Sequence, residues 1–182
     1  MKKSEEKGNI WFTADSHYGH TNVIRFCKRP FATIEEMDEA LIANYNECVK
    51  QGDTVYHLGD FSFARNPAAI FYRLNGNKHL VLGNHDWKQL GELKKLPWGW
   101  IKDVYFLRYG KGKSDKIWLN HFAQRAWPSG HHGTIHLYGH SHGSLEDYGR
   151  STDVGVDAWD YKPVHLDTIL KMMEKREVIK HH

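Results

Sequence analysis

Five short apolar segments of this 182-residue chain each end in aspartate, asparagine or histidine. The segments read NIWFTA, TVYHLG, HLVLG, KIWLN and TIHLYG, and their β-branched and aromatic residues are typical of strands. The polar residues that follow them are DSH at 15–17, D at 60, NHD at 84–86, H at 121 and HSH at 140–142. Ligands of sheet proteins gather beyond the carboxyl ends of strands, so we expect these five ends to meet in space.

The residue types at these strand ends suit a divalent metal site. Aspartate and asparagine offer oxygen and histidine offers nitrogen, which favours Mn²⁺, Fe²⁺ or Zn²⁺ and argues against a cysteine-type structural zinc. The candidate ligands are Asp15, His17, Asp60, Asn84, His121, His140 and His142. Each of them alone is ordinary turn chemistry. Seven together are too many for one tetrahedral ion and suit two ions that share a bridge.

The same motifs resemble those of the calcineurin-like metallophosphoesterases. DSH (15–17), GD (59–60), GNHD (83–86), a lone histidine (121) and GHSH (139–142) follow that family's order over most of the chain. The likeness is strongest to small bacterial and phage-type members without a cap domain. The stretches RPF (29–31), VYHLGDF (55–61) and VGVDAWDYKPV (154–164) add to it.

The resemblance implies a metal-dependent phosphoesterase with two divalent ions per chain. It assigns one ion to Asp15, His17, Asp60 and His142. It assigns the second ion to Asp60, Asn84, His121 and His140, so that Asp60 bridges the two. We expect Mn²⁺ first, with Fe²⁺, Zn²⁺ or Ni²⁺ as the other candidates. Two such ions lower the pKa of a shared water, and the resulting bridging hydroxide attacks the phosphate ester.

Two residues of the GNHD motif have roles other than metal binding in this interpretation. In the family, the histidine after the asparagine is not a ligand, so His85 is expected to protonate the leaving oxygen or to stabilise the transition state. The carboxylate of Asp86 is expected to support the site by orienting His85.

Other side chains near the motifs are candidates for substrate contact. Arg65 and Arg125 follow predicted ligands by five and four residues, so each has the reach to bind a phosphate. His20 follows the DSH motif and either contacts substrate, supports the ligands or begins a helix. Trp87 and Trp127 also neighbour ligands, and we expect them to pack rather than to stack on a base.

Helix and strand signals indicate the fold class. Thr33 and Glu36 form a capping box before a helix that Gly52 is expected to end as the C′ residue. Asn66 and Pro67 begin a second helix. Further helices are expected after residue 21, after residue 85 and from about residue 167.

The order of these elements predicts an α/β (α+β) fold. The first half alternates strand and helix, and the second half is mostly strand, with VYFLRY and KIWLN as a hairpin turning at 111–113. We therefore expect a four-layer αββα sandwich with two mixed β-sheets flanked by helices. The length and the absence of linkers predict one domain over residues 1–182.

Composition excludes some classes and leaves others open. The formal net charge is only +3, and Cys27 and Cys48 lack a CxxC spacing, so nucleic-acid binding is weakly supported and a reducing compartment is expected. No apolar run approaches the roughly 18 residues of a membrane span, and the N-terminus does not read as a signal sequence, so we expect a cytoplasmic protein. His181 and His182 match the stub of a purification tag.

Several functions remain open within this interpretation. The GNHD form, without the DRG sequence of Ser/Thr protein phosphatases, favours a phosphodiester substrate. A nuclease or nucleotide phosphohydrolase is the first alternative, since residues 88–116 hold eight Lys or Arg and three acidic residues. A catalytically silent metal-binding interaction module is the second. The sequence does not indicate the oligomeric state.

Overall fold

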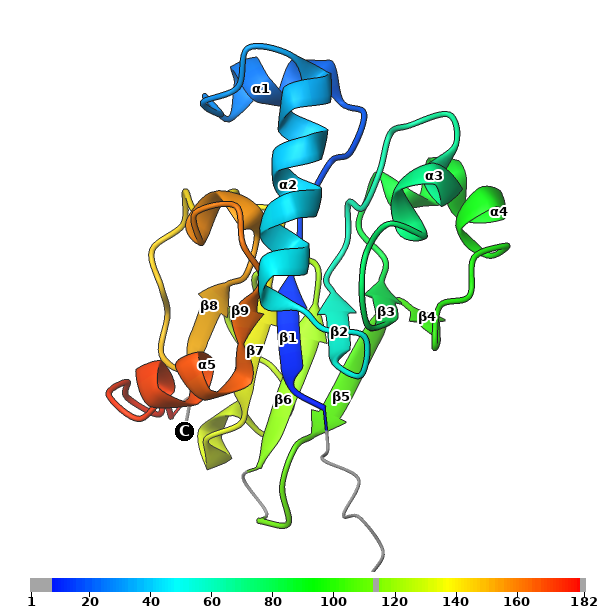
Figure 1. Cartoon of the computed structure of the whole chain (residues 1–182). Helices are drawn as coiled ribbons and strands as arrows, with labels where there is room; N and C mark the ends of the chain where they lie inside the picture. The colour runs from blue at the N-terminus through cyan, green and yellow to red at the C-terminus, as the bar shows by residue number, and fades with distance from the viewer. Residues whose placement is uncertain (1–7, 113–114, 181–182) are drawn as a thin grey trace, which may run out of the picture.

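Two mixed β-sheets face each other in the computed structural model, which describes residues 8–112 and 115–180 (Figure 1). The first sheet has the strand order β4-β3-β2-β1-β9. Its strands are β1 (Ile10–Thr13), β2 (Thr54–His57), β3 (Asn77–Val81), β4 (Ile101–Lys102) and β9 (Val164–His165). All neighbours in it are parallel except β9, which pairs antiparallel with β1.

The second sheet has the strand order β5-β6-β7-β8. Its strands are β5 (Val104–Arg108), β6 (Lys116–Asn120), β7 (Ile135–Tyr138) and β8 (Ser151–Asp153). The strands β5 and β6 pair antiparallel, which confirms the predicted hairpin, although Lys113 of its turn lies outside the described residues. The strands β6, β7 and β8 are parallel.

Helices cover the outer face of the first sheet. They are α2 (Ile34–Cys48), α3 (Pro67–Phe71) and α4 (Leu90–Leu93), and the lower end of α2 lies in front of β1 in Figure 1. The short helix α1 (Thr21–Phe26) lies beyond the strand ends, beside the other end of α2. Met37, Leu41 and Tyr45 recur at helical spacing in α2 and pack in one core with Val55 of β2 and Leu80 of β3. This apolar face of α2 fixes the helix on the sheet, because burial of such side chains stabilises the packed arrangement.

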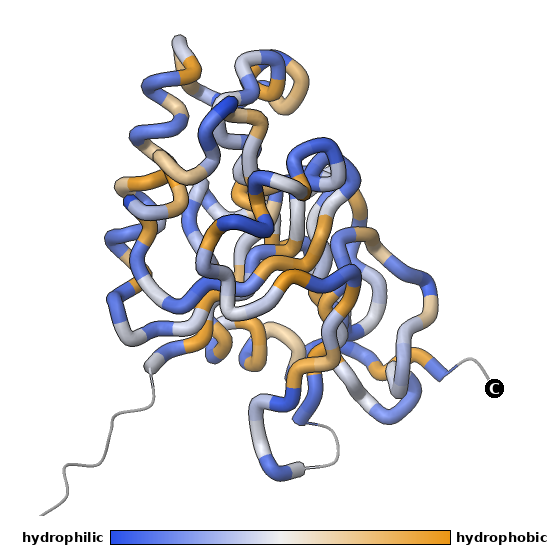
Figure 2. Tube along the Cα trace, turned by 90° about the vertical axis from the view of Figure 1, so that its right-hand side faces the viewer, coloured by the Kyte–Doolittle hydropathy of each residue, from blue (hydrophilic) through white to orange (hydrophobic). Residues whose placement is uncertain are grey.

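A second core fills the space between the sheets. Tyr56 follows Val55 in β2 and points to the opposite face, where it joins Phe12, Ile117 and Leu137. The hydrophobic stretches of the chain gather in this interior, and hydrophilic stretches form the surrounding loops (Figure 2). The helix α5 (Leu166–Met173) packs against the same core beside β9 (Figure 1).

The outer face of the second sheet is covered mainly by irregular chain. Trp118 of β6 donates a hydrogen bond to Gln124 at 2.7 Å, and Trp127 donates to the carbonyl of Thr134 at 2.8 Å. The same segment contains the 3-10 turn η2 (Gly130–His132). The two mixed sheets with their flanking helices confirm the predicted α/β sandwich.

The ends of α2 test the predicted capping residues. Thr33 accepts a hydrogen bond from the amide of Glu36 at 3.1 Å, so the N-cap is confirmed. The expectation for Gly52 is wrong, because α2 ends at Cys48 with an extended Val49 as its C-cap. The carboxylate of Asp53 accepts a hydrogen bond from the amide of Lys50 at 2.8 Å, just after the end of the helix. This contact turns the chain toward β2.

The parallel pairing brings the predicted strand ends to one edge of the molecule. The strands β1, β2 and β3 end together in the first sheet, and β6, β7 and β8 end together in the second. Ala14 after β1 pairs with Gly155 after β8 in an isolated parallel bridge, which joins the two sheets at that edge. Within the described residues, no helix is both long enough and apolar enough to cross a membrane.

Candidate metal centre

The predicted ligands form two groups at the shared edge of the sheets. In the first group, one ligand atom from each of Asp15, His17 and His142 lies within 4.8 Å of the others. In the second group, Asp60, His121 and His140 meet the same limit. The Oδ2 atom of Asp60 is 3.6 Å from Nε2 of His17 and 3.6 Å from Nε2 of His121. The carboxylate of Asp60 therefore lies between the groups.

Asn84 and His85 follow β3 and face these groups. The Oδ1 atom of Asn84 is 3.1 Å from Nε2 of His121, which adds an amide oxygen to the second group. The Nε2 atom of His85 is 3.9 Å from Oδ2 of Asp60, and 35% of the His85 side chain is exposed. His85 therefore lies beside the midpoint of the site and is open to a ligand from solvent.

Backbone strain is concentrated at the predicted ligands. Five of the seven adopt the left-handed conformation: Asp15 (φ 54°), His17 (φ 53°), Asp60 (φ 55°), His140 (φ 67°) and His142 (φ 49°). This region costs a non-glycine residue about 1–2 kcal/mol. Such strain is characteristic of functional sites, where the surrounding structure holds residues in positions that the chain alone does not favour.

The buried donor set fits a divalent cation. The Oδ1 atom of Asp15 and both ring nitrogens of His17 are buried and have no hydrogen-bond partner. Burial lowers the pKa of His17 well below its usual range, so the ring is neutral and has a lone pair to share. Leaving buried polar atoms unpaired is costly, and a cation between Asp15 and His17 would satisfy the Asp15 oxygen and one of the two ring nitrogens.

Two glycines let the ligand loops approach each other closely. A Cβ atom on Gly59 would lie 2.4 Å from Nδ1 of His121, and one on Gly83 would lie 2.2 Å from Oδ1 of Asp60. Gly59 also has a positive φ of 100°. The loops after β2, β3 and β6 therefore pack together only because these two positions have no side chain.

Asp86 supports the site in a different way from the one predicted. Its carboxylate accepts the amides of Asp60 and Gly83, each at 2.8 Å, and the amide of Phe61 at 2.9 Å. The Nδ1 atom of His85 has no hydrogen-bond partner, so the expectation that Asp86 orients His85 is wrong. Asp86 instead locks the loop after β2 to the loop after β3, because it begins the 3-10 helix η1 (Asp86–Gln89) and points back at both loops.

Three further charged residues support the site and were given no role from the sequence. Asp153 accepts hydrogen bonds from the hydroxyl of Ser141 at 2.5 Å and from the amide of Gly143 at 2.9 Å. Arg29 and Asp157 form an ion pair at 2.7 Å behind the first group. The sequence features that point to Arg29 and Asp157 are the stretches RPF and VGVDAWDYKPV, which contain these two residues.

The predicted substrate contacts lie at different distances from the centre. The ring of His20 is 5.4 Å from that of His17 and stacks on Phe63 at 4.0 Å, so His20 is beside the first group. Arg65 is exposed on the loop after β2. Arg125 lies over the ring of Tyr148 at 4.4 Å and lines a separate cavity of about 350 Å³, which does not include a predicted ligand.

The two tryptophans next to ligands also differ. Trp127 packs against the ring of His136 at 5.4 Å and donates to Thr134, which confirms its packing role. The expectation for Trp87 is wrong, because its side chain is 56% exposed rather than packed.

A cavity of about 540 Å³ opens beside the two ligand groups. Its walls are Phe26, Cys27 and Lys28 at the end of α1, and Ser141, Ser144 and Leu145 of the loop after β7. His140 and His142 line its inner side. Phe26 and Leu145 are 63% and 53% exposed, so this cavity offers apolar surface next to the predicted metal ligands.

Comparisons with known proteins agree with this architecture. The model of the calcineurin-like phosphoesterase family matches residues 8–171. The uncharacterized protein MJ1445 of Methanocaldococcus jannaschii is 33% identical over 182 residues, covering 94% of this chain and 94% of that protein. The gene 66 protein of Mycobacterium phage D29 is 31% identical over 198 residues, covering 93% of this chain and 98% of that protein.

A solved structure shares the fold. AQ665 of Aquifex aeolicus, a protein of unknown function, matches with a TM-score of 0.68 and 24% identity, over 91% of this chain and 99% of that chain. This chain likewise has a two-sheet sandwich, and aspartate, asparagine and histidine groups that suit a divalent metal ion lie at its strand ends. This chain belongs to the calcineurin-like phosphoesterase family. It is therefore a metal-dependent hydrolase of phosphate esters.

Proposed function

We propose that the chain hydrolyses a phosphodiester at a centre of two divalent cations, with Mn²⁺ as the first candidate and Fe²⁺, Zn²⁺ or Ni²⁺ as the others. The position of Asp60 carries this proposal, because its Oδ2 atom lies 3.6 Å from a histidine of each ligand group. Two bound cations would lower the pKa of a shared water to generate hydroxide and would offset charge on the phosphoryl oxygens. The first ion takes Asp15, His17, Asp60 and His142, and the second takes Asp60, Asn84, His121 and His140.

His85 acts on the substrate rather than on the metals in this proposal. Its side chain is partly exposed, and its backbone amide donates to Oδ1 of Asp60 at 2.9 Å, which fixes the residue beside the centre. An imidazole at this position can deliver a proton to the leaving oxygen as the P–O bond breaks. The ring of Phe63, 4.9 Å from that of His85, limits where the imidazole can turn.

The surroundings of the centre support a diester over a monoester. Phe63 lies on one side, 5.4 Å from the ring of His17, and Phe122 lies on the other, 4.7 Å from the ring of His140. The cavity beside His142 adds a third apolar surface. A diester carries an organic group on each side of phosphorus, and both groups gain contact with apolar surface here.

A metal-by-substrate matrix tests the proposal. Protein stripped of metal is reloaded with Mn²⁺, Ni²⁺, Zn²⁺ or Mg²⁺ and assayed on bis-p-nitrophenyl phosphate and on p-nitrophenyl phosphate. We expect the highest kcat/KM with Mn²⁺ on the diester, together with two bound ions per chain by elemental analysis. Faster hydrolysis of the monoester in every metal refutes the diester preference. Inactivity on both substrates in every metal favours a silent metal-binding module.

A nucleotide-type diester is a second candidate, and the cavity beside His142 favours it. Phe26 presents an aromatic ring for stacking, and Lys28 presents a cation for an additional phosphate. We expect Phe26→Ala to raise KM for thymidine 5′-(p-nitrophenyl phosphate) and to leave KM for bis-p-nitrophenyl phosphate within about twofold. Equal changes on both substrates contradict this candidate.

A further inference from the structure

Arg29 is a buried arginine whose hydrogen bonds to oxygen atoms all lie on one side of the site, and whose Nη1 also contacts Sδ of Met37 at 3.4 Å. Only 4% of the residue is exposed. Its Nε and Nη2 atoms donate to the two carboxylate oxygens of Asp157 at 2.8 and 2.7 Å. Nη2 also donates to the carbonyl of Asp15 at 2.6 Å, and Nη1 donates to the carbonyl of Ser16 at 3.0 Å. One guanidinium thus holds the backbone inside the first ligand motif.

Asp157 connects this arginine to a second ligand of the same group. Its Oδ2 atom accepts a hydrogen bond from Nδ1 of His142 at 2.7 Å. A histidine with its proton fixed on Nδ1 presents the lone pair of Nε2, and a carboxylate partner also raises the basicity of that nitrogen. Asp157 therefore selects both the tautomer and the orientation of His142.

The second ligand group is held differently. Nδ1 of His121 bonds to the neutral carbonyl of Leu58 at 2.7 Å, in place of a carboxylate. The hydrogen bonds of Arg29 to main-chain and carboxylate oxygens all reach residues beside or behind Asp15, His17 and His142. The direct hydrogen bonds of Arg29 and Asp157 therefore reach only the first of the two groups, although the carboxylate of Asp15 in turn accepts the amide of His140 at 2.8 Å.

We propose that Arg29 and Asp157 are positioning residues for the first metal position alone. This inference rests on the proposed centre of two ions. A buried arginine with a bidentate carboxylate and two carbonyl partners uses the planar, five-donor geometry of the guanidinium, which a lysine cannot reproduce. Arg29→Lys therefore releases the Asp15–Ser16 backbone or Asp157, and the first ligand group loses its geometry.

Metal titration of the full chain separates the two positions. Metal-free protein is titrated with Mn²⁺ by calorimetry, and bound metal is measured after gel filtration. In Arg29→Lys and Asp157→Asn, we expect one binding event to weaken by about 10- to 100-fold, which is the usual effect of removing a supporting partner. The Kd of the other binding event should stay within about twofold of its wild-type value.

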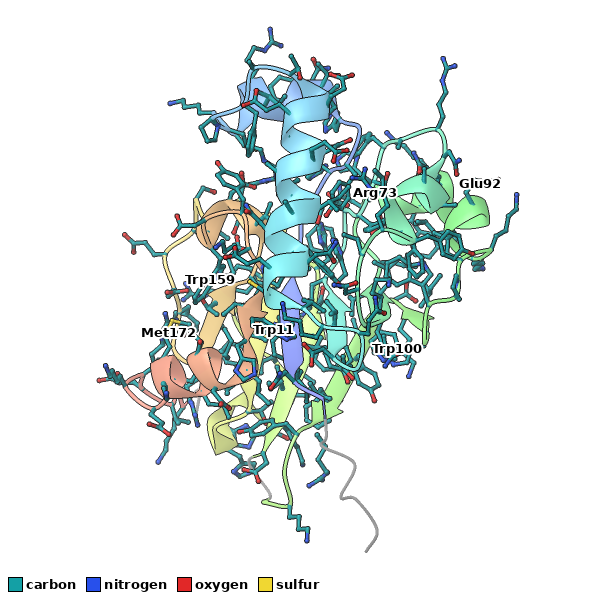
Figure 3. The ribbon with its side chains drawn as sticks, in the orientation of Figure 1. Trp11, Arg73, Glu92, Trp100, Trp159 and Met172 are labelled. Atoms are coloured by element: carbon teal, nitrogen blue, oxygen red, sulfur yellow. The ribbon has the colours of Figure 1, made fainter. Side chains whose placement is uncertain are left out.

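A second ion pair on the same chain provides the matched control. Arg73 donates to both carboxylate oxygens of Glu39 at 2.7 and 2.6 Å, and it lies at the surface beside α2 (Figure 3). Arg73→Lys removes the same bidentate geometry from a pair whose carboxylate belongs to α2 and not to a ligand loop. We expect both binding events to be unchanged in this variant.

Ligand variants assign the weakened event to its position. His17→Ala removes a ligand of the first group only. In this variant, adding Arg29→Lys should change the Kd of the remaining metal-binding event by less than about twofold. In an Asn84→Ala background, Arg29→Lys should still weaken the remaining event by about 10- to 100-fold. This cycle distinguishes a local role from a general one, because coupling is limited to residues that act together.

The outcomes separate this inference from the proposed function. Equal weakening of both events, or no weakening, overturns the positioning role. A wild-type chain that binds a single ion refutes the centre of two ions. In that case, weaker binding of the single ion in Arg29→Lys still supports the positioning role, and unchanged binding refutes it. Urea unfolding of the metal-free variants shows which of them fold. If Arg29→Lys does not fold, the metal titration is done with Asp157→Asn alone.

Discussion

A methyl group on Gly83 would separate two loops that the centre requires to touch. The Cβ atom of Gly83→Ala would lie 2.2 Å from Oδ1 and 2.5 Å from the backbone nitrogen of Asp60. Gly83 is not among the glycines with positive φ, so alanine tolerates its backbone conformation and only the contacts change. The substitution therefore tests close packing against the predicted bridging residue and nothing else.

The size of the displacement follows from these distances. Ordinary van der Waals contact begins at 3.4 Å, so the Asp60 nitrogen must retreat by 3.4 − 2.5 = 0.9 Å. Asp86 opposes this movement, because one of its oxygens accepts both the Asp60 and the Gly83 amides at 2.8 Å. Overpacking of this kind costs about 1–3 kcal/mol, and loss of one hydrogen bond to a charged group costs about 1.5–3 kcal/mol.

We therefore expect Gly83→Ala to lose about 2.5–6 kcal/mol in the free energy of unfolding. Because a misplacement of about 1 Å can cost about 100-fold in rate, kcat on a diester substrate should fall at least that far. The assays are urea unfolding of the metal-free protein at pH 8, metal content after reloading, and hydrolysis of bis-p-nitrophenyl phosphate.

Gly91→Ala is the matched control for this prediction. Gly91 lies in α4, and a Cβ atom there would meet nothing within 4 Å. Its replacement by alanine should raise the free energy of unfolding by up to about 1 kcal/mol, because alanine is the better helix former. If Gly83→Ala stays within about 0.5 kcal/mol of wild type and keeps its metal and activity, the close-packing argument is refuted.

Three other expectations concern single side chains. His85→Ala should retain its metal content but lose about 10²–10⁴-fold in kcat, most on esters with poor leaving groups, and a loss of bound metal would show that His85 is a ligand. Asp60→Asn should reduce the binding of both ions, whereas Asn84→Ala should weaken one, and elemental analysis distinguishes the two results. Burial lowers the pKa of Lys78 to about 8, below its unfolded value of about 10.4. The unfolded chain thus holds more protons on Lys78 between these values, so the contribution of Lys78 to stability should rise with pH across that window by about 1 kcal/mol after solvent screening; the difference in unfolding free energy between wild type and Lys78→Met, measured in urea at each pH, should show that rise.

The sequence was sufficient to predict which residues gather at the centre. A strand end is a local feature, and parallel strands bring their carboxyl ends to one edge, so Asp15, Asp60 and Asn84 are placed by neighbouring residues and sheet topology alone. The three short strands β4, β8 and β9 gave no comparable signal, because two or three residues are too few to show alternation.

The supporting residues could not be found in the same way. Arg29 and Asp157 are 128 positions apart, and their pairing depends on how α1 and η3 (Val156–Ala158) pack after folding. Asp86 was misassigned because it adjoins His85 in sequence, whereas a 3-10 helix begins at Asp86 and directs its carboxylate at the backbone of Asp60 and Gly83. Arg125 was placed near the centre by spacing, and the ring of Tyr148 holds it in a separate cavity.

Buried carboxylates explain how the strained ligand loops keep their shape. Asp86 joins the loops after β2 and β3, Asp153 holds the loop after β7, and Asp157 holds His142. Each of these carboxylates is a charged acceptor, and hydrogen bonds to charged groups are worth about 1.5–3 kcal/mol each, which is comparable with the strain of a left-handed ligand residue. These hydrogen bonds to amides and to an imidazole hold the three carboxylates in place, so the positions of the acidic groups are set by the fold. A preorganised set of this kind favours cations over neutral ligands, because its field is already in place before a substrate arrives.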